Sequence, residues 1–248
     1  MKVKICKEEK AMYQNYIFDL YGTLVDIHTD EFKPSLWRQM ASFYSLKGAE
    51  YQGKELMKDY LRLVDMEQER LARKQQMEIS HVEIVLDKVF AKLYSQKGVK
   101  ASKQLVEDTM VMFRMLSTSH IRLFPGVKDL LLRLRADGKG IYLLSNAQAN
   151  FTRPEMKMLG IYDCFDGILY SSDALVKKPS GVFYQMLFDK YQLGKETAVM
   201  VGNDARADMI GAADFGIPGL YVRTDESWRP DELPNGCYEI KHIGEVYP

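Results

Sequence analysis

The sequence predicts an α/β protein, in which a Rossmann-like parallel sheet forms the core and an all-helical domain is inserted after the first strand. Three observations predict this fold: short apolar runs, segments of helical period between them, and one long stretch without strand-like alternation. Strands that alternate with helices form parallel sheets with helices on their faces. The expected strands are residues 16–18, 141–144, 168–170, 199–201 and 220–222.

The helices expected between these strands have recognisable starts and ends. Pro125 opens a helix whose apolar residues fall on a single face, and Gly138 ends it. Two others are predicted over residues 182–191 and 206–215, and Gly216 stops the second of them. We expect these helices to pack against the sheet.

The stretch from Asp30 to Ser117 separates the first expected strand from the second and shows only helical spacing. Apolar residues there recur three and four positions apart, which is typical of the buried face of a helix. Gly53 and Gly98 are the expected breaks between its helices. We therefore expect an inserted helical domain over residues 30–117 and a core domain made of residues 1–29 and 118–248.

Composition and charge exclude several classes of function. The chain has 248 residues, of which 46% are hydrophobic and 27% charged, and its formal net charge is zero. No basic block interleaved with aromatic residues predicts a nucleic-acid groove, and the N-terminal residues lack the apolar run of a signal peptide or membrane span. We expect a cytoplasmic monomer or homodimer that acts on a small molecule, with no nucleic-acid or membrane partner.

The cysteines predict neither a disulfide framework nor a zinc site. Cys6, Cys164 and Cys237 are odd in number, far apart and without CxxC spacing. We expect all three to be ordinary thiols.

Asp19 directly follows the first expected strand, in the run FDLYGT. A carboxylate at the carboxyl end of a parallel strand stands where open α/β sheets bind ligands. It can act as a nucleophile that forms a covalent intermediate. Because aspartate is also common in turns and helix caps at such places, the other strand ends decide between the two interpretations.

Polar residues follow the next two expected strands as well. Ser145 and Asn146 come after the second strand, where their side chains can hydrogen-bond an anionic group held against Asp19. Lys178, next to a proline, comes after the third strand and can neutralise both the nucleophile and a transferred group. Its neighbour Lys177 is better explained as a solvated surface residue.

Two acidic residues follow the fourth expected strand. Asp204 and Asp208 are four positions apart, which places them on one side of the following helical turn. Paired carboxylates beside a glycine suit Mg²⁺, which prefers oxygen ligands and keeps several waters. The sequence therefore predicts a magnesium site at this edge of the sheet.

Taken in order, these segments read DxxGT, the Ser of SN, KP and GNDxxxD, and the ordered set resembles the haloacid dehalogenase (HAD) superfamily. The resemblance covers residues 16–222. It implies hydrolysis by an aspartate nucleophile and a helical cap after the first motif. Such a cap excludes water from the site and selects the substrate.

The resemblance implies a catalytic role for four residues. Asp19 resembles the nucleophile, and Thr23 and Ser145 resemble the hydroxyls that orient it or its adduct. Lys178 resembles the lysine that neutralises charge.

It also implies a set of metal ligands. Asp19, Asp204 and the backbone carbonyl of Tyr21 resemble the groups that hold Mg²⁺. Asp208 resembles the neighbouring carboxylate that positions Lys178 or a metal-bound water.

The first motif departs from that of the family's phosphatases, which carry a second aspartate, a general acid, where this chain has Tyr21. In this respect the chain is similar to the 2-haloacid dehalogenases, whose first motif reads DxYGTL and whose halide leaves without a proton. In that comparison Arg38 is expected to bind a substrate carboxylate and Tyr184 to contact the substrate. For Tyr184, packing on a helix face is an equally good interpretation.

The fourth motif favours a phosphatase instead. Dehalogenases of the family need no metal, whereas Asp204 facing Asp19 without a cation would cost several kcal/mol. We therefore expect a Mg²⁺-dependent phosphatase of a small phosphorylated metabolite, with a 2-haloacid dehalogenase as the alternative and a non-catalytic binding module as a less favoured one. The proton donor for the leaving group stays open; Tyr21 is one option, although a phenol of pKa near 10 suits neutral pH poorly.

Overall fold

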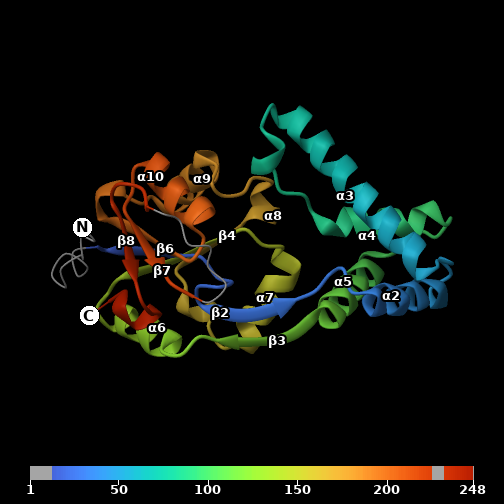
Figure 1. The fold of residues 1–248 in the computed structure, drawn as a ribbon, viewed down its shortest axis with the longest axis horizontal. Coiled ribbons are helices and arrows are strands. Elements are labelled where there is room, and N and C mark those ends of the chain that lie inside the picture. The colour runs from blue at the N-terminus through green and yellow to red at the C-terminus, as the bar shows by residue number, and fades with distance from the viewer. Residues whose placement is uncertain (1–12, 225–231, 248) are drawn as a thin grey trace.

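The computed structural model describes residues 13–224 and 232–247, which form an α/β core joined to a helical cap by a two-stranded ribbon (Figure 1). The core sheet has six parallel strands in the order β5-β4-β1-β6-β7-β8. Their bounds are β1 Asn15–Phe18, β4 Gly140–Ser145, β5 Gly167–Tyr170, β6 Ala198–Gly202, β7 Gly219–Val222 and β8 Cys237–Ile240. The predicted α/β fold is confirmed.

Strand β1 lies in the middle of the sheet, between β4 and β6. Its side chains alternate between the two faces, because successive residues of a strand point in opposite directions. Tyr16 and Phe18 pack with α6 on one face, and Ile17 packs with α9 and α10 on the other. The end of β1 is thus the point where the strand order reverses, which is where open α/β sheets bind ligands.

The helices of the core cover both faces of this sheet (Figure 1). Their bounds are α6 Val127–Ala136, α7 Ala149–Met158, α8 Ser171–Ala174, α9 Gly181–Tyr191 and α10 Gly211–Phe215. Short 3₁₀ turns lie at η2 Tyr162–Cys164, η3 Lys195–Thr197 and η5 Ile243–Glu245. The helix predicted over 206–215 is in fact a π-helical turn, η4 Ala205–Ile210, followed by α10.

Residues 30–117 are helical, as predicted, and contribute no strand to either sheet. Their elements are α2 Pro34–Leu46, α3 Gly53–Gln75, η1 Ile79–His81, α4 Leu86–Gln96 and α5 Lys103–Ser117. They pack around a cluster of aromatic side chains, of which Trp37, Tyr60, Phe90 and Phe113 are buried and in mutual ring contact. We call residues 30–117 the cap; its exact division from the core stays a prediction.

The sequence failed to predict three strands. Strands β2 Val25–Thr29 and β3 Thr118–Leu123 pair antiparallel as the ribbon that leads into and out of the cap (Figure 1). Most of their residues are only half-buried or exposed, so they show no apolar alternation that would reveal a strand. The third is β8, a short edge strand beside β7.

Two further findings bear on the sequence predictions. Within the described ranges, no helix combines the length and the apolar character needed to cross a membrane. Cys164 and Cys237 are free thiols, whereas Cys6 lies outside the described residues.

Candidate active site

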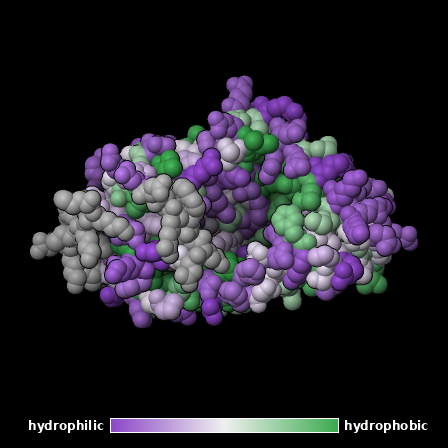
Figure 2. All heavy atoms as spheres, viewed as in Figure 1, coloured by the Kyte–Doolittle hydropathy of each residue, from purple (hydrophilic) through white to green (hydrophobic). Residues whose placement is uncertain are grey.

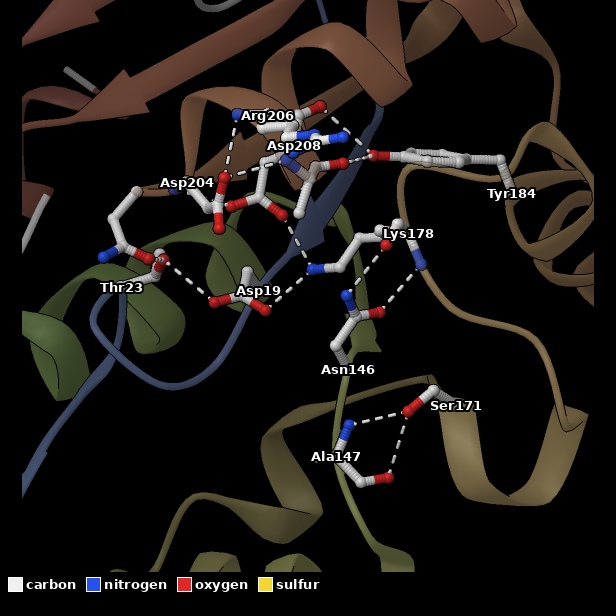
Figure 3. Close-up of polar contacts among 12 residues, drawn as sticks. Asp19, Thr23, Asn146, Ala147, Ser171, Lys178, Tyr184, Asp204, Arg206 and Asp208 are labelled. Carbon is white, nitrogen blue, oxygen red and sulfur yellow. Dashed lines mark hydrogen bonds and ion pairs between the residues drawn. The ribbon is translucent and has the colours of Figure 1, made fainter. Parts of the chain in front are cut away.

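A buried network of charges stands at the carboxyl edge of the sheet (Figure 3). The Nζ of Lys178 lies 2.7 Å from Oδ1 of Asp19 and 2.7 Å from Oδ1 of Asp208. The side chains of Lys178 and Asp208 are each 1% exposed, and that of Asp19 is 12% exposed. We call these three residues the charge network; Asp19 is its most exposed member.

Burial and charge act against each other in this network. Burial alone would lower the pKa of Lys178, but the attraction of Asp19 and Asp208 outweighs it, and the pKa is raised. Burial raises the pKa of the Asp208 carboxyl despite the adjacent ammonium group. The lysine therefore stays charged, as neutralisation of a nucleophilic carboxylate requires.

The loop after β1 brings a hydroxyl to the other oxygen of Asp19. Thr23 Oγ1 lies 3.3 Å from Oδ2 of Asp19 and 3.1 Å from Oδ1 of Asn203. Gly22 makes this turn possible, since its φ is +78° and a Cβ atom there would collide with the Asn203 amide. Sequence reasoning did not single out Asn203 as a site residue.

Asn146 holds the loop that carries Lys178, residues 175–180, which we call the lysine loop. Its Nδ2 donates to the Lys178 carbonyl at 3.0 Å, and its Oδ1 accepts from the Lys178 amide at 2.8 Å. Ser145, the last residue of β4, is buried beside it. In this structure Asn146 therefore positions Lys178, in addition to lining the cavity described below.

Asp204 stands beside Asp208 at the end of β6 (Figure 3). Its Oδ1 accepts from the backbone amides of Arg206 and Ala207, each at 2.8 Å, and so caps the π turn η4. Its amide donates to Oδ2 of Asp208 at 3.0 Å. Among the described residues none donates a hydrogen bond to Oδ2 of Asp204, which leaves that oxygen available to a ligand.

The donor chemistry at this edge fits Mg²⁺. Carboxylate and carbonyl oxygens are its preferred ligands, and it commonly takes only one or two protein carboxylates beside water. Within the described residues no three acidic, histidine or cysteine side chains are grouped as a metal cluster. An ion held by Asp19 and Asp204 would therefore also use a backbone carbonyl, such as that of Tyr21, and water.

The Tyr21 side chain is tied to a neighbouring ion pair. Its hydroxyl donates to the Glu155 carboxylate and lies 3.0 Å from Thr152 Oγ1. Glu155 in turn receives Nε of Arg114 at 2.6 Å and Nη2 at 3.2 Å. We call Tyr21, Arg114, Thr152 and Glu155 the cap clamp, because Arg114 comes from cap helix α5 and the other three from the core.

The arrangement of the cap clamp argues against Tyr21 as the proton donor for a leaving group. Burial and the nearby Glu155 raise the pKa of Tyr21 further above its usual value. The hydroxyl proton is also already engaged with Glu155. In this structure the Tyr21 side chain links the core to the cap, and its role as a general acid stays a prediction that this geometry does not favour.

A cavity of about 320 Å³ separates the cap from the core beside Tyr21, and the space-filling view shows a hollow between these two parts (Figure 2). The lining residues are Tyr21, Ile27, Thr29, Glu31, Glu83, Leu86, Arg114, Asn146, Ala147, Gln148, Phe151 and Thr152. Burial raises the pKa values of Glu31 and Glu83. Sequence reasoning missed Glu31, Glu83 and Arg114, whose only sequence signal is that each is a charged residue within the predicted cap.

Two predicted substrate ligands lie elsewhere. Arg38 is exposed on α2 and does not line the cavity, because the face of α2 that packs inward carries Trp37, Met40 and Ala41. Tyr184 is fully buried under the charge network, where its hydroxyl donates to the backbone carbonyls of residues 207 and 208 at 3.1 Å each. The cap arginine that lines the cavity is Arg114.

The fold agrees with comparisons to known proteins. The family model of the haloacid dehalogenase-like hydrolases matches residues 13–216. The chain belongs to this family of hydrolases, which confirms the resemblance found from the four motifs.

Its curated relatives fall into two groups. The phosphoglycolate phosphatase of Yersinia pestis is 34% identical over 125 residues, 49% of this chain and 53% of that protein. The (S)-2-haloacid dehalogenase of Pseudomonas sp. (strain YL) is 26% identical over 213 residues, 83% of this chain and 80% of that protein. The chain thus spans about half the length of the phosphatase it matches and most of the length of the dehalogenase.

Solved structures share the whole fold. A 2-haloacid dehalogenase from Pseudomonas syringae pv. Tomato DC3000 has a TM-score of 0.67 at 20% identity, over 95% of this chain and 96% of that one. A HAD phosphatase from Thermococcus onnurineus has a TM-score of 0.58 at 17% identity, over 94% and 95%. At these identities the likeness concerns the fold, cap included, and leaves the substrate open.

Proposed function

We propose that this hydrolase is a Mg²⁺-dependent phosphatase that acts on a small phosphorylated metabolite. The observation that carries the proposal is the Asp204 carboxylate beside the charge network, with Oδ2 free of donors from the described residues. The Lys178 ammonium group pairs with Asp19 and Asp208, so these two carboxylates share one positive charge, and Asp204 adds a further carboxylate at this edge. Without a cation, this excess of negative charge would repel an anionic substrate.

Asp19, Asp204 and the Tyr21 carbonyl are the groups that would hold the ion. When bound, Mg²⁺ would neutralise charge on the oxygens of the transferred phosphoryl group. Asp208 serves a different purpose in this proposal, since its oxygens already receive Lys178 and the Asp204 amide.

The chain's own residues then perform two displacements at phosphorus. An oxygen of Asp19 attacks phosphorus in line, the bond to the leaving oxygen breaks, and an aspartyl phosphate forms. Lys178 neutralises the attacking carboxylate and the equatorial oxygens, and the Thr23 and Ser145 hydroxyls orient Asp19 or its adduct. Water then attacks phosphorus, which releases inorganic phosphate and restores the Asp19 carboxylate.

The cap clamp limits the choice of substrate. Because the Tyr21 hydroxyl is engaged with Glu155, the position that holds a general acid in related phosphatases supplies no proton here. We infer a substrate whose leaving group departs as a stable anion, such as the carboxylate of an acyl phosphate. A cavity of about 320 Å³ suits a small molecule.

A second candidate function is hydrolytic removal of halide from a 2-haloacid. Tyr21 in the first motif favours it, as does the match to a dehalogenase over 83% of this chain. In that reaction Asp19 attacks the carbon that bears the halogen, the halide leaves with the bonding electrons, and water hydrolyses the resulting ester. No metal and no leaving-group acid are needed.

A release assay separates the two. The purified protein is offered a panel of acyl, aryl and alkyl phosphates and a panel of 2-haloacids, each with Mg²⁺ or with excess EDTA. We expect phosphate release that EDTA abolishes and that Asp204→Asn lowers strongly. Halide release that persists in EDTA and survives Asp204→Asn would establish the dehalogenase instead.

A further inference from the structure

The cap meets the core through a short segment that pairs with the lysine loop. Val82 of the cap forms an antiparallel bridge with Val176. On either side of it, the Glu83 amide donates to the Leu175 carbonyl at 3.1 Å, and the Lys177 amide donates to the His81 carbonyl at 2.8 Å. This pairing ends one residue before Lys178, so the backbone of the cap supports the loop that carries the catalytic lysine.

Glu83 adds a side-chain connection from the same segment of the cap. Ser171 Oγ donates to its Oε2 at 2.9 Å, and Gln148 Nε2 donates to its Oε1 at 3.2 Å. The Glu83 carboxylate is half-buried, and burial raises its pKa. Bonds to a partly buried carboxylate are stronger than bonds between neutral groups.

The connection continues from Ser171 to the charge network (Figure 3). The Ala147 amide donates to Ser171 Oγ at 2.8 Å. Ala147 follows Asn146, whose side chain makes two hydrogen bonds to the Lys178 backbone. A continuous path of hydrogen bonds and one peptide bond thus runs from Glu83 in the cap to the lysine beside Asp19.

We propose that Glu83 is a positioning residue, which sets the place of Lys178 through Ser171, Ala147 and Asn146 when the cap docks. The proposal deepens the proposed function and rests on it, because it takes Lys178 as the counter-charge of the nucleophile Asp19. In this proposal the cap does more than cover the cavity, because it also helps to place Lys178 at the carboxyl edge of the sheet.

The geometry of Ser171 explains why the carboxylate matters. The hydroxyl has one proton and two acceptors in reach, Glu83 Oε2 at 2.9 Å and the Ala147 carbonyl at 3.3 Å. When the hydroxyl donates its hydrogen bond to Glu83, its oxygen accepts a hydrogen bond from the Ala147 amide. Without Glu83, the hydroxyl proton turns to the Ala147 carbonyl, and the loop that carries Asn146 loses its link to the cap through Ser171. The Gln148 side chain still contacts the cap at the Ile84 carbonyl and the Leu86 amide.

The test compares two contacts between cap and core. Glu83→Ala, Glu83→Gln and Ser171→Ala weaken the proposed path. Asn150→Ala is the matched control. It removes a different hydrogen bond between core and cap, from Asn150 Nδ2 to Asp87 Oδ2 at 2.7 Å, and this bond involves neither the loop that carries Asn146 nor the lysine loop. For each variant, kcat and KM are measured, and hydrogen–deuterium exchange is followed in peptides 143–149 and 175–180.

We expect Glu83→Ala to lower kcat about tenfold or more, because small displacements of catalytic groups cost large factors in rate. KM should change less than kcat, and exchange in both peptides should rise clearly above that of Asn150→Ala. Ser171→Ala should reproduce this result, and Glu83→Gln, which keeps an acceptor oxygen, should fall between it and the wild type. If Glu83→Ala does not fold, the other two variants are judged by the same criteria.

Three results would overturn the proposal: an unchanged kcat, a loss of kcat without faster exchange in these peptides, or equal effects from Asn150→Ala. The rate is measured on whichever group the wild type releases, phosphate or halide. A wild type that releases neither would refute the proposed function, and exchange alone would then decide whether Glu83 holds the lysine loop.

Discussion

The charge network and the cap clamp are two polar clusters that meet in the loop after β1, where Asp19 belongs to the first and Tyr21 to the second. They differ in which parts of the molecule supply their side chains. The charge network comes entirely from core segments that follow β1, β5 and β6. Its Lys178 and Asp208 side chains are each 1% exposed. The cap clamp joins core and cap, and its Arg114 and Glu155 side chains are 16% and 13% exposed. The side chains of the first cluster all come from the core, whereas the second is complete only while the cap supplies Arg114.

This difference separates chemistry from selectivity. Parallel strands place their carboxyl ends at one edge, so the segments that follow β1, β5 and β6 bring Asp19, Lys178 and Asp208 together. The cap contributes no side chain to this network, although it supports the loop that carries Lys178. Arg114 reaches Tyr21 and Glu155 only across the boundary between the two parts. Variants of the charge network should therefore change the chemical step, and variants of the cap clamp should change binding and closure.

The largest effect is expected for Asp19→Asn. The amide keeps the shape of the side chain and loses the nucleophilic charge, so turnover should fall roughly 10⁴-fold or more. The measurement is a single-turnover assay on the best substrate of the release panel. Asp26→Asn, on the ribbon, is the matched control and should retain activity; activity near wild type in Asp19→Asn would remove this residue from the mechanism.

Lys178→Met should impair both activity and stability. It leaves Asp19 and Asp208 facing each other without a counter-charge, and breaking a buried ion pair from one side typically costs about 3 kcal/mol or more of the free energy of unfolding. Urea denaturation measures this loss. Adding Asp208→Asn should restore part of the stability and none of the activity; a double variant no more stable than Lys178→Met would contradict the charge explanation.

The sequence predicts that the members of the charge network lie together, because each stands in a short motif that follows a core strand. Gly22 and Gly202 show the reason: a Cβ atom on Gly22 would collide with the Asn203 amide, and one on Gly202 with the Asp208 carboxylate. These glycines occupy fixed places in short motifs, so local sequence carries the geometry. The strands of the core are also predictable from local sequence, because burial of β1 and β6 makes them continuous apolar runs.

The cap clamp and the cavity could not be predicted in this way. Arg114 and Glu155 are 41 positions apart, and Tyr21 lies 134 positions from Glu155. On its own, each is a polar residue on an amphipathic helix or a turn, and nothing local tells which of them meet. Arg38 illustrates the limit: the motif around it suggested a ligand, but its place on α2 turns it to solvent.

Arg114→Ala should weaken substrate binding more than catalysis. The change leaves the Glu155 carboxylate with only the Tyr21 hydroxyl, and it removes the ion pair that joins α5 to α7. We expect KM to rise about tenfold, which corresponds to 1.4 kcal/mol of binding free energy, with a smaller change in kcat. Arg70→Ala, which breaks an exposed pair with Glu67, is the control; a loss confined to kcat would place Arg114 in the chemical step instead.

Tyr21→Phe should have a modest effect. It removes one hydrogen bond to Glu155 and keeps the ring against Arg114, so stability should fall by about 1 kcal/mol. Turnover should stay within about threefold of wild type, because a general acid is typically worth on the order of 10²-fold or more and this hydroxyl is otherwise engaged. Steady-state kinetics on aryl and alkyl phosphates test this, and a large loss confined to the alkyl esters would restore Tyr21 as the proton donor.

The smallest effect is expected for Glu31→Gln, which probes the cavity wall near Arg114 without removing a hydrogen bond made by a described residue. Burial raises the pKa of Glu31 in the folded protein, against the attraction of Arg114. The folded state therefore favours the protonated carboxyl, and stability falls as the pH rises from the pKa of the unfolded chain through that of the folded one. Gln carries no charge at any pH and escapes this loss.

The variant should consequently match wild type near pH 4 and exceed it at pH 7, by a melting temperature about 1–3 °C higher. Thermal unfolding of both proteins at several pH values measures the difference, and Glu50→Gln, at an exposed position of the cap, controls for the loss of a surface charge. A gain that is equal at pH 4 and pH 7, or a loss at pH 7, would mean that Arg114 outweighs burial at this site. In that case the wild-type Glu31 carboxylate belongs with the cap clamp, as a second partner of the arginine that faces the substrate.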